Sequence, residues 1–516
     1  MARTCVLLML DGFGVGRKDV SNPIHVADGE NLRYLRENYP SAALQASGIA
    51  VGLPWEESGN SKVGHLTIGA GRTVYQNYPR ISLDIRSGKF FENEALLEAI
   101  NHAKTNYSTL HLCGLLSEGH IHSSLEHLEA LLSLAAKEGV KDVALHLIAD
   151  GKDSAPKSVE DLLSRVESIT RDKGVGRVAS IIGRYYGMDK NGNWDRTAHA
   201  YSVMTADTTS EGEFSAVAAK TYERGMNDDF IPGFVFGPKP SPVKNNDALV
   251  FFNFQEDDIR QLAASFILPA FDKFERRQIQ NLFIATFTKY SDLFEVPVAF
   301  PQEEILNTLG QVISDSGKAQ MLVAETINYA ATSYYFNGLR DEVFDGQFNV
   351  SVPSLNVPSF IGKEEMQAKE VANRVVQAVD EHSYDFIFAN FANADILAQT
   401  GNFDATVKAV KAIDGELGRI IKTCEVAGVT LIVTSAHGNA ENVMNSSTGA
   451  MDTRFNDSPV PIYFMDTERK KASPQAPVRE SEIIGMLSDL APTVLEIMDI
   501  EKPKEMTGKS LVGFLR

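Results

Sequence analysis

The stretch that decides the fold is residues 5–14, which read CVLLMLDGFG. An unbroken apolar run that stops at Asp11 and Gly12 is typical of a strand buried on both faces and ending in a polar turn. Similar apolar runs recur along the sequence, at 110–116, 143–149, 177–182, 248–254, 281–287, 385–391 and 429–434. We therefore expect a set of buried strands spread over the whole chain.

Helical patterns separate several of these runs. The clearest lies at 403–424, where apolar residues recur at three- and four-residue steps and Gly428 follows as a stop. Alternating strands and helices predict an α/β fold with parallel sheets. Residues 226–247 and 466–479 are rich in polar residues and Pro and are expected to be surface loops. Functional residues of such folds lie beyond the carboxyl ends of strands, a position held here by Asp11, Gly151 to Asp153, Asn393, Asp395 and Ser435 to Asn439.

Length and composition limit the classes of function. A chain of 516 residues exceeds what one hydrophobic core usually supports, so we expect two domains. The formal charge of -19 argues against nucleic acid or an anionic membrane as a partner, since both require a basic surface. The three cysteines form no close pair, and the first apolar run is too short for a signal peptide or a membrane span. We expect a cytoplasmic protein.

Residues 59–72, GNSKVGHLTIGAGR, present Ser61 beside what is expected to be a glycine-rich loop. Many phosphoryl-transfer sites present a nucleophile in this way, although a serine hydroxyl is inert until a base or a metal ion removes its proton. Taken singly, Ser61 could instead cap a helix, and Asp11 could cap a turn. Lys62 is interpreted as a solvated lysine at a helix start, with a role in anion binding as the alternative.

Several motifs, all in one order, resemble the cofactor-independent phosphoglycerate mutases of the alkaline phosphatase superfamily. They are LDGFG at 10–14, GNSKVGHLTIGAGR at 59–72, GRYYGMD at 183–189, FFNF at 251–254, VPVAFPQEEILNTLG at 296–310, NFANAD at 390–395 and HGNAE at 437–441. The resemblance implies a discontinuous phosphatase-like metal domain, 1–77 plus 300–516, with a transferase-like substrate domain inserted at 78–299. It also implies that two manganese ions activate Ser61, which moves a phosphoryl group between neighbouring hydroxyls of phosphoglycerate.

The metal ligands implied by the resemblance are incomplete in this sequence. The catalytic Ser61 and the metal ligands Asp11, Ser61, Asp395 and His437 are present, but Ala436 stands where an aspartate is expected. Two further positions expected to hold histidines hold Gln399 and Phe455. The carboxylates Glu441, Asp452 and Asp457 are open as substitutes, since manganese accepts oxygen ligands. We expect at most one weakly held ion, or none.

The substrate-binding positions implied by the resemblance have changed in the same direction. The matching residues are His122, Lys152, Asp153, Arg184 and Lys190, of which the two lysines replace arginines and lose the two-pronged grip on an anion. Cations expected after FFNF and after Thr326 are replaced by Gln255, Asp258 and Asn328. For Arg184, an ion pair with Asp189 is an equally good structural explanation. Residues His65, His120 and His127 are interpreted as structural histidines in loops.

These losses favour a member of this mutase family that has lost, or severely reduced, its mutase activity. It would act as a non-catalytic binding or regulatory paralogue. The alternative is a metal-dependent phosphotransferase, either the glycolytic mutase that interconverts 3-phosphoglycerate and 2-phosphoglycerate or a one-metal phosphatase of altered specificity. A small phosphorylated metabolite would bind weakly, a protein partner is open, and the sequence leaves the oligomeric state undecided.

Overall fold

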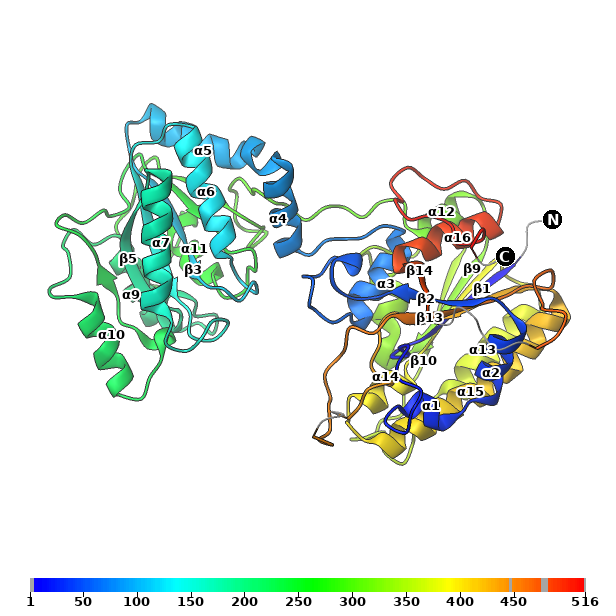
Figure 1. Cartoon of the computed structure of the whole chain (residues 1–516). Helices are drawn as coiled ribbons and strands as arrows, with labels where there is room; N and C mark the ends of the chain where they lie inside the picture. The colour runs from blue at the N-terminus through cyan, green and yellow to red at the C-terminus, as the bar shows by residue number, and fades with distance from the viewer. Residues whose placement is uncertain (1–3, 445–447, 475–480, 515–516) are drawn as a thin grey trace. The chain divides into compact units, whose positions relative to one another are not determined.

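The computed structural model describes residues 4–444, 448–474 and 481–514. The chain divides into two compact units, Met1–Gln76 with Glu304–Arg516, and Asn77–Glu303 (Figure 1). The expected boundaries, after 77 and before 300, lie within four residues of these divisions. The roles expected for the two domains stay predictions.

Unit 1, the discontinuous one, is built on an eight-stranded sheet in the order β10-β9-β11-β1-β12-β13-β2-β14. Strand β1 (Cys5–Leu10) lies in the middle and pairs in parallel with β11 and β12. Strand β13 is antiparallel to both of its neighbours, so the sheet is mixed rather than wholly parallel. The other bounds are β2 (Ser41–Gln45), β9 (Gln320–Glu325), β10 (Gln347–Val352), β11 (Phe386–Phe391), β12 (Thr430–Thr434), β13 (Val460–Met465) and β14 (Ile483–Met486).

Apolar side chains of β1 alternate between two helical layers, which explains its unbroken apolar run. Val6, Leu8 and Leu10 pack with α13 and α15, whereas Cys5, Leu7 and Met9 pack with α3 and α16. The helices are α1 (Pro23–Ala27), α2 (Glu30–Asn38), α3 (Ser61–Ala70), α12 (Leu309–Asp315), α13 (Ala368–Asp380), α14 (Asn393–Ala398), α15 (Phe403–Ala427) and α16 (Leu490–Ile497). Short turns of helix are η1 (Gly48–Val51), η4 (Thr326–Asn328), η5 (Ala331–Tyr335) and η6 (Leu487–Asp489).

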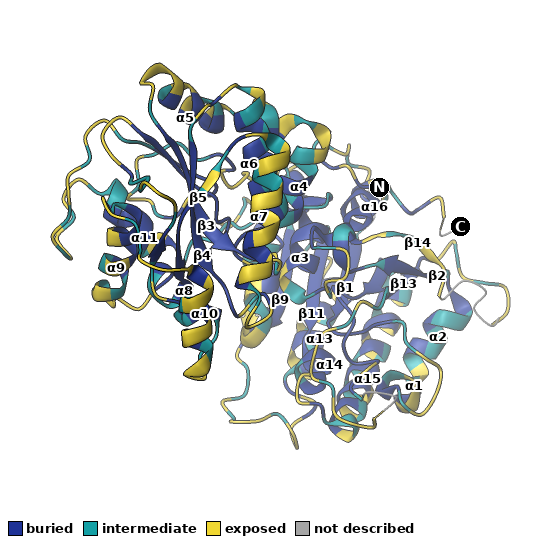
Figure 2. Ribbon diagram, turned by 60° about the vertical axis from the view of Figure 1, so that its left-hand side comes forward, coloured by how far each residue is buried: buried dark blue, intermediate teal, exposed yellow. Residues whose placement is uncertain are grey.

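Unit 2 holds a six-stranded sheet in the order β6-β5-β4-β3-β7-β8, parallel except for β6. Its strands are β3 (Leu110–Leu116), β4 (Val143–Ala149), β5 (Arg177–Gly183), β6 (Phe234–Val235), β7 (Ala248–Phe251) and β8 (Phe283–Thr286). The buried strands are covered by helices with exposed outer faces, as α7 shows in Figure 2. These elements are α4 (Asn77–Ser87), η2 (Lys89–Glu92), α5 (Glu94–Thr105), α6 (Leu125–Lys137), α7 (Val159–Lys173), α8 (Arg184–Gly187), α9 (Trp194–Met204), α10 (Phe214–Glu223), η3 (Asp228–Phe230) and α11 (Arg260–Ile267).

The stretch 59–72 forms a helix, so the expectation of a glycine-rich loop is wrong. Asn60, and not Ser61, is the N-cap of α3, because its side chain accepts a 3.1 Å hydrogen bond from a backbone N–H of the first turn. Gly64 lies inside the helix, where an added Cβ would stand 2.4 Å from the carbonyl oxygen of Ala436. The absence of a side chain at Gly64 therefore permits close packing of α3 against Ala436. The helix ends at Gly71, which takes the left-handed conformation with φ 59°.

The remaining sequence expectations agree in outline with the structure. The α/β class is confirmed, and each predicted buried strand is present, with the predicted ends for β1, β3 and β4 and with shifted ends for the others. The helix expected at 403–424 continues to Ala427 before Gly428 ends it. Residues 226–247 are mostly loop but contain η3 and β6, and 475–479 of the second predicted loop lie outside the described residues. Among the described helices, none is both long enough and apolar enough to cross a membrane.

Candidate functional site

Asp11 and Ser61 meet at the carboxyl end of β1. The Ser61 hydroxyl, at the start of α3, donates a 2.8 Å hydrogen bond to Oδ2 of the fully buried Asp11. Burial opposes the charged form of this carboxyl, but His65, His437 and hydrogen bonds from Asn390 and Ser61 outweigh it and lower the pKa of Asp11. A carboxylate with a lowered pKa is a weak base toward a serine hydroxyl.

A closed ring of hydrogen bonds surrounds this pair. Asn328 Nδ2 donates to Asp11 Oδ2 over 2.6 Å and to Asn390 Oδ1 over 2.8 Å. Asn390 Nδ2 lies 3.1 Å from His65 Nε2, which therefore acts as an acceptor. The proton of His65 is thereby assigned to Nδ1, which lies 2.8 Å from the carbonyl oxygen and 3.2 Å from the hydroxyl of Ser61. In this tautomer His65 donates to Ser61 and is not placed to remove its proton.

The second carboxylate, Asp395, is held in the first turn of α14. Asn439 Nδ2 donates to its Oδ1 over 2.7 Å, and Gln399 Nε2 donates to its Oδ2 over 2.8 Å. His437 Nε2 lies 3.8 Å from Asp395 Oδ1. Burial is the main reason that the pKa of Asp395 is raised, with the Asp11 carboxylate adding to the effect. Both oxygens of Asp395 are thus occupied by neutral amide donors.

Two apolar side chains fill the remaining positions of the cluster. The methyl group of Ala436 is fully buried and faces Gly64 of α3. The ring of Phe455 lies edge-on to the His437 imidazole, with centroids 4.9 Å apart. His437 Nε2 has no hydrogen-bond partner among the described residues. The other ring nitrogen, Nδ1, lies 3.2 Å from the carbonyl oxygen of Gly438, the kind of partner that supports a metal-binding histidine, so the departure from a metal site lies in the neighbouring Phe455 and Ala436.

Of the three carboxylates that were open as substitute ligands, Glu441 and Asp452 have other partners. Glu441 Oε2 accepts the backbone N–H groups of Gly14 and Asn439, each over 2.9 Å, and so ties two loops together. Asp452 pairs with Arg454 over 2.9 Å. Asp457 lies with Asp452 in an open surface hollow of about 720 Å³.

The residues present do not fit a pair of resident metal ions. Sites for ions such as manganese are built from carboxylates and imidazoles that converge on one point. Within residues 4–444, 448–474 and 481–514, no three His, Cys, Asp or Glu side chains are arranged to hold a metal ion. The positions where further ligands were expected offer a methyl group, a phenyl ring and an amide.

In unit 2, Arg184 follows β5 and is enclosed by carboxylates. Its Nη1 lies 2.7 Å from Asp150 Oδ1 and 3.2 Å from Asp153 Oδ2, and its Nη2 lies 3.3 Å from Asp258 Oδ2. Asp150 is the polar residue directly after β4. The turn expected from the sequence began at Gly151 and therefore did not include Asp150. Although burial opposes the charge, these carboxylates raise the pKa of Arg184.

Asp189 does not pair with Arg184, so that explanation of the arginine is wrong. Its Oδ2 instead lies 2.9 Å from Nη1 of Arg196 on α9. Both residues of this pair are close in sequence, seven positions apart, and the arginine stacks on a tyrosine ring at 3.8 Å. Arg184 points to the carboxyl ends of the strands, where Asp150 and Asp258 lie, and its partners are therefore distant in sequence.

The other expected substrate residues of unit 2 join the same cluster or lie at its rim. His122 Nε2 is 3.6 Å from Asp258 Oδ2, and Lys190 Nζ is 2.7 Å from Asp258 Oδ1. Lys152 is exposed and reaches Asp229 over 3.7 Å, and Gln255 is half-buried in the segment after β7. Three permanently charged cations, Arg184, Lys152 and Lys190, therefore face five carboxylates, Asp150, Asp153, Asp229, Asp257 and Asp258.

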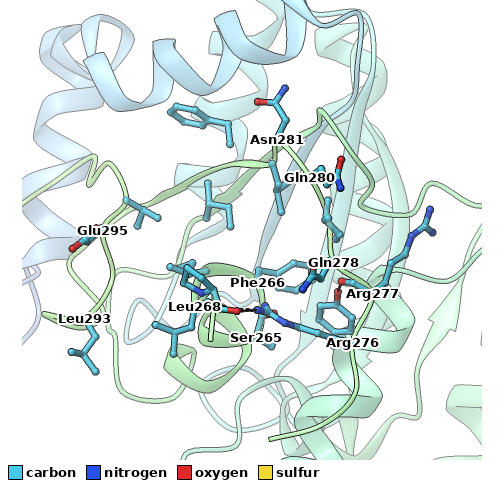
Figure 3. Close-up of a pocket in the computed structure, with 18 of the residues that line it drawn as sticks. Ser265, Phe266, Leu268, Arg276, Arg277, Gln278, Gln280, Asn281, Leu293 and Glu295 are labelled. Carbon is cyan, nitrogen blue, oxygen red and sulfur yellow. Dashed lines mark hydrogen bonds between the residues drawn. The ribbon is translucent and has the colours of Figure 1, made fainter. Parts of the chain in front are cut away.

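A separate hollow of about 830 Å³ in unit 2 shares no residue with these clusters (Figure 3). It is lined by the end of α11 and by residues 276–284 and 293–297. The Arg276 guanidinium donates to the carbonyl oxygens of Ser265 and Leu268, so it caps the carboxyl end of α11. We assign this hollow no function.

Comparison with known proteins places the chain in a family. Residues 81–292 match the family model described as the BPG-independent PGAM N-terminus. The chain is 40% identical over 514 residues to 2,3-bisphosphoglycerate-independent phosphoglycerate mutase 1 of Methanosarcina barkeri, covering 98% of each chain. It is 42% identical over 516 residues to the corresponding mutase of Moorella thermoacetica, covering 99% of this chain and 98% of that protein. A crystal structure of Leishmania mexicana phosphoglycerate mutase, at low cobalt concentration, matches with a TM-score of 0.56 and 24% identity over 99% of this chain and 97% of that one.

The fold and the clustered Asp11, Ser61, Asp395 and His437 define an α/β protein of the alkaline phosphatase superfamily with a second unit inserted. The identity of about 40% to these two mutases, over nearly the whole chain, identifies the family within this superfamily. The chain belongs to the 2,3-bisphosphoglycerate-independent phosphoglycerate mutases. Sequence reasoning missed Asp150, which directly follows β4, and Asn390, which lies near the end of β11, whereas Asn439 was among the expected positions after β12. His65 and His127 were expected in loops, but they lie in α3 and α6.

Proposed function

We propose that this chain is a phosphoglycerate-mutase-family protein whose mutase activity is lost or severely reduced, and that it acts as a binding or regulatory protein. The observation that carries the proposal is the hydrogen-bond ring around Asp11. Asn328 and Ser61 both donate to Asp11 Oδ2, so the carboxylate is stabilised by neutral donors. The ring supplies neutral donors to Oδ2 only, since the buried Oδ1 has no hydrogen-bond partner among the described residues and lies 3.9 Å from His65 Nε2.

The chemistry of Ser61 follows from the same contacts. Its hydroxyl needs a strong base or a Lewis acid before it can attack phosphorus. His65 donates to it and is not placed to take its proton, and the lowered pKa of Asp11 makes that carboxylate a weak base. With Ala436 and Phe455 in place of ligands, two ions have no complete ligand set in the described residues. Ser61 is therefore proposed to serve as a hydrogen-bond donor within the ring.

The active glycolytic mutase is the second candidate, and one observation favours it. The relatives compared above are named as mutases, match over nearly the whole chain, and give no indication of lost activity. Ser61 also keeps its place beside Asp11. Under this reading a weakly held ion, manganese by resemblance, would bind near Asp11 and His437.

Location and ligands form part of the proposal. The three cysteines, Cys5, Cys113 and Cys424, are free and buried, which supports the cytoplasmic location inferred from sequence. A phosphorylated metabolite would meet a carboxylate-rich cluster in unit 2, which supports weak binding. Binding of a protein partner is the remaining possibility.

Elemental analysis and a mutase assay on the same preparation test the proposal. The purified chain is incubated with excess manganese, desalted, and analysed for bound metal and for conversion of 3-phosphoglycerate to 2-phosphoglycerate. The Methanosarcina barkeri relative serves as the active reference, and Ser61→Ala measures activity from contaminating enzyme. We expect less than one ion per chain and a rate equal to that of Ser61→Ala. Two bound ions with turnover near that of the reference would overturn the proposal and establish the second candidate.

A further inference from the structure

Asp258 lies where the ends of three parallel strands of unit 2 converge. It follows β7, while Arg184 follows β5 and Asp150 follows β4. The region beyond the carboxyl ends of parallel strands is where ligands of α/β proteins bind. The Asp258 side chain is only 11% exposed, so its charge is largely removed from water. A carboxylate at this position has to be paired with cations.

The basic groups around Asp258 come from two segments, since Arg184 and Lys190 both follow β5 and His122 follows β3. Its Oδ2 lies 3.3 Å from Arg184 Nη2 and 3.6 Å from His122 Nε2, and its Oδ1 lies 2.7 Å from Lys190 Nζ. The neighbouring Asp257 differs, because it reaches only Lys190, over 3.3 Å, among the ion pairs of the described residues. Asp258 is therefore the carboxylate that joins the three groups into one cluster.

We propose that Asp258 is a built-in anion that occupies the space between Arg184, Lys190 and His122 and excludes free carboxylates and phosphates from it. This inference concerns unit 2 alone and does not rest on the proposed loss of mutase activity. Asp258 would act as a specificity-determining residue that rejects anions. The cations would remain in place as its partners.

The physical reason is competition within the chain. A carboxylate fixed between the Arg184 and Lys190 cations, with the His122 ring beside it, is present at a high effective concentration, so a free anion has to displace it. Displacement would leave the Asp258 charge buried without partners, which is strongly unfavourable in proteins. Asp150 and Asp153 hold the other side of the Arg184 guanidinium and add further repulsion against a second anion.

The test compares two single variants of the full chain, with inorganic phosphate as the probe. Asp258→Ser removes the charge and leaves space, whereas the matched Asp257→Ser removes a neighbouring charge without touching Arg184. Isothermal titration calorimetry is expected to show at least tenfold tighter phosphate binding for Asp258→Ser than for Asp257→Ser or the wild type. Adding Arg184→Gln to Asp258→Ser is expected to abolish the gain.

Three outcomes would overturn the inference. One is equal phosphate affinity of Asp258→Ser and Asp257→Ser, and a second is a gain that survives Arg184→Gln. The third is phosphate bound at Arg184 in a crystal of the wild-type chain soaked in phosphate, and this arm stands even where a variant fails to fold. None of these measurements depends on manganese or on mutase turnover, so the inference and the proposed function fail or hold separately.

Discussion

Asn328 Nδ2 donates a 2.6 Å hydrogen bond to Asp11 Oδ2, the same oxygen that accepts the Ser61 hydroxyl over 2.8 Å. One buried carboxylate oxygen therefore joins η4 and α3 to the end of β1. The amide supplies a donor without supplying charge, which is how a buried carboxylate is satisfied when no cation is near. The cluster is consequently expected to contribute to folding as well as to any binding.

Replacing Asn328 with Ala tests this structural contribution. The change removes one donor from Asp11 and one from Asn390, and leaving buried acceptors unpaired is expected to cost about 1–3 kcal/mol of unfolding free energy. Urea denaturation measures the loss. The exposed Asn442 of the same unit offers a control, since Asn442→Ala is expected to shift stability by less than about 0.5 kcal/mol. Equal effects of the two changes would argue against the ring.

Substitution of two glycines, one in α3 and one in α15, tests the close packing of α3. An added Cβ at Gly64 would stand 2.4 Å from the backbone carbonyl of Ala436, so Gly64→Ala is expected to destabilise the chain by about 1–3 kcal/mol. Gly415 lies in α15 with no atom within 4 Å of an added Cβ, so Gly415→Ala is expected to stabilise it by about 0.5–1 kcal/mol. Chemical denaturation midpoints would move in opposite directions. Midpoints that move together would contradict the packing described for α3.

Sequence reasoning predicted β1, β11 and β12 of unit 1 but missed β2, β9 and β13, which lie inside the same sheet, and the edge strands β10 and β14. Strands such as β1 and β3 are buried at every residue, because helices cover both faces. Strand β10 alternates apolar and polar residues and is an edge strand, and β14 at the other edge is short. A helix start near Ser61 and Lys62 was among the interpretations, but the glycines that follow were expected to form a loop because glycine usually weakens helices, whereas here packing against Ala436 requires Gly64.

The sequence predicted individual residues of the candidate site but not the hydrogen bonds and ion pairs between them. Position after a strand, together with family resemblance, selected Asp11, Asp395 and His437, which the structure brings close to Ser61. The partners of Arg184 could not be predicted, since they lie 34, 31 and 74 positions away and depend on strand order. Ring contacts such as Asn328 with Asp11 depend likewise on tertiary structure.

Two arginines of unit 2 allow the contribution of a buried ionic cluster to stability to be compared with that of a surface ion pair. Arg184→Gln would leave carboxylates such as Asp150 and Asp258 buried without their shared cation, and we expect a loss of about 3–5 kcal/mol of unfolding free energy. Arg165 pairs with Glu118 on the surface, so Arg165→Gln is expected to cost less than about 1 kcal/mol. Denaturant unfolding of both variants gives the comparison. A loss below about 1 kcal/mol for Arg184→Gln would show that the cluster is not stabilising.

Acid is expected to destabilise unit 2 through His127. Burial lowers the pKa of this histidine from its ordinary value of 6.5 to about 3, and its Nε2 lies 3.1 Å from the Ser82 hydroxyl. The unfolded chain therefore binds the proton first, so the contribution of His127 is complete above pH 6.5 and falls between pH 6.5 and about 3. The loss approaches about 1.4 kcal/mol per pH unit for one proton.

Unfolding free energies of the wild type and His127→Gln, measured at pH 7, 6 and 5, give the slope due to His127. Burial also lowers the pKa values of His111 and His146, but these act in both proteins and cancel in the difference. The His382→Asn variant reports the contribution of an exposed histidine, at a position of φ 50° that asparagine accepts. Parallel pH profiles for the wild type and His127→Gln would rule out this account.

Restoring the missing ligands is expected to restore metal binding. The triple variant Ala436→Asp, Gln399→His and Phe455→His places a carboxylate and two imidazoles beside Asp395 and His437, a donor set suited to manganese. Calorimetric titration with manganese is expected to show affinity at least about tenfold above the wild type, since ligand shells change affinity by this order even indirectly. Adding Asp395→Asn to the triple variant serves as the control, because it removes a carboxylate from the restored set and is expected to reverse much of the gain. If the wild type binds manganese as tightly as the triple variant, the substitutions at 399, 436 and 455 do not limit metal binding, and the loss of mutase activity proposed from them has no basis.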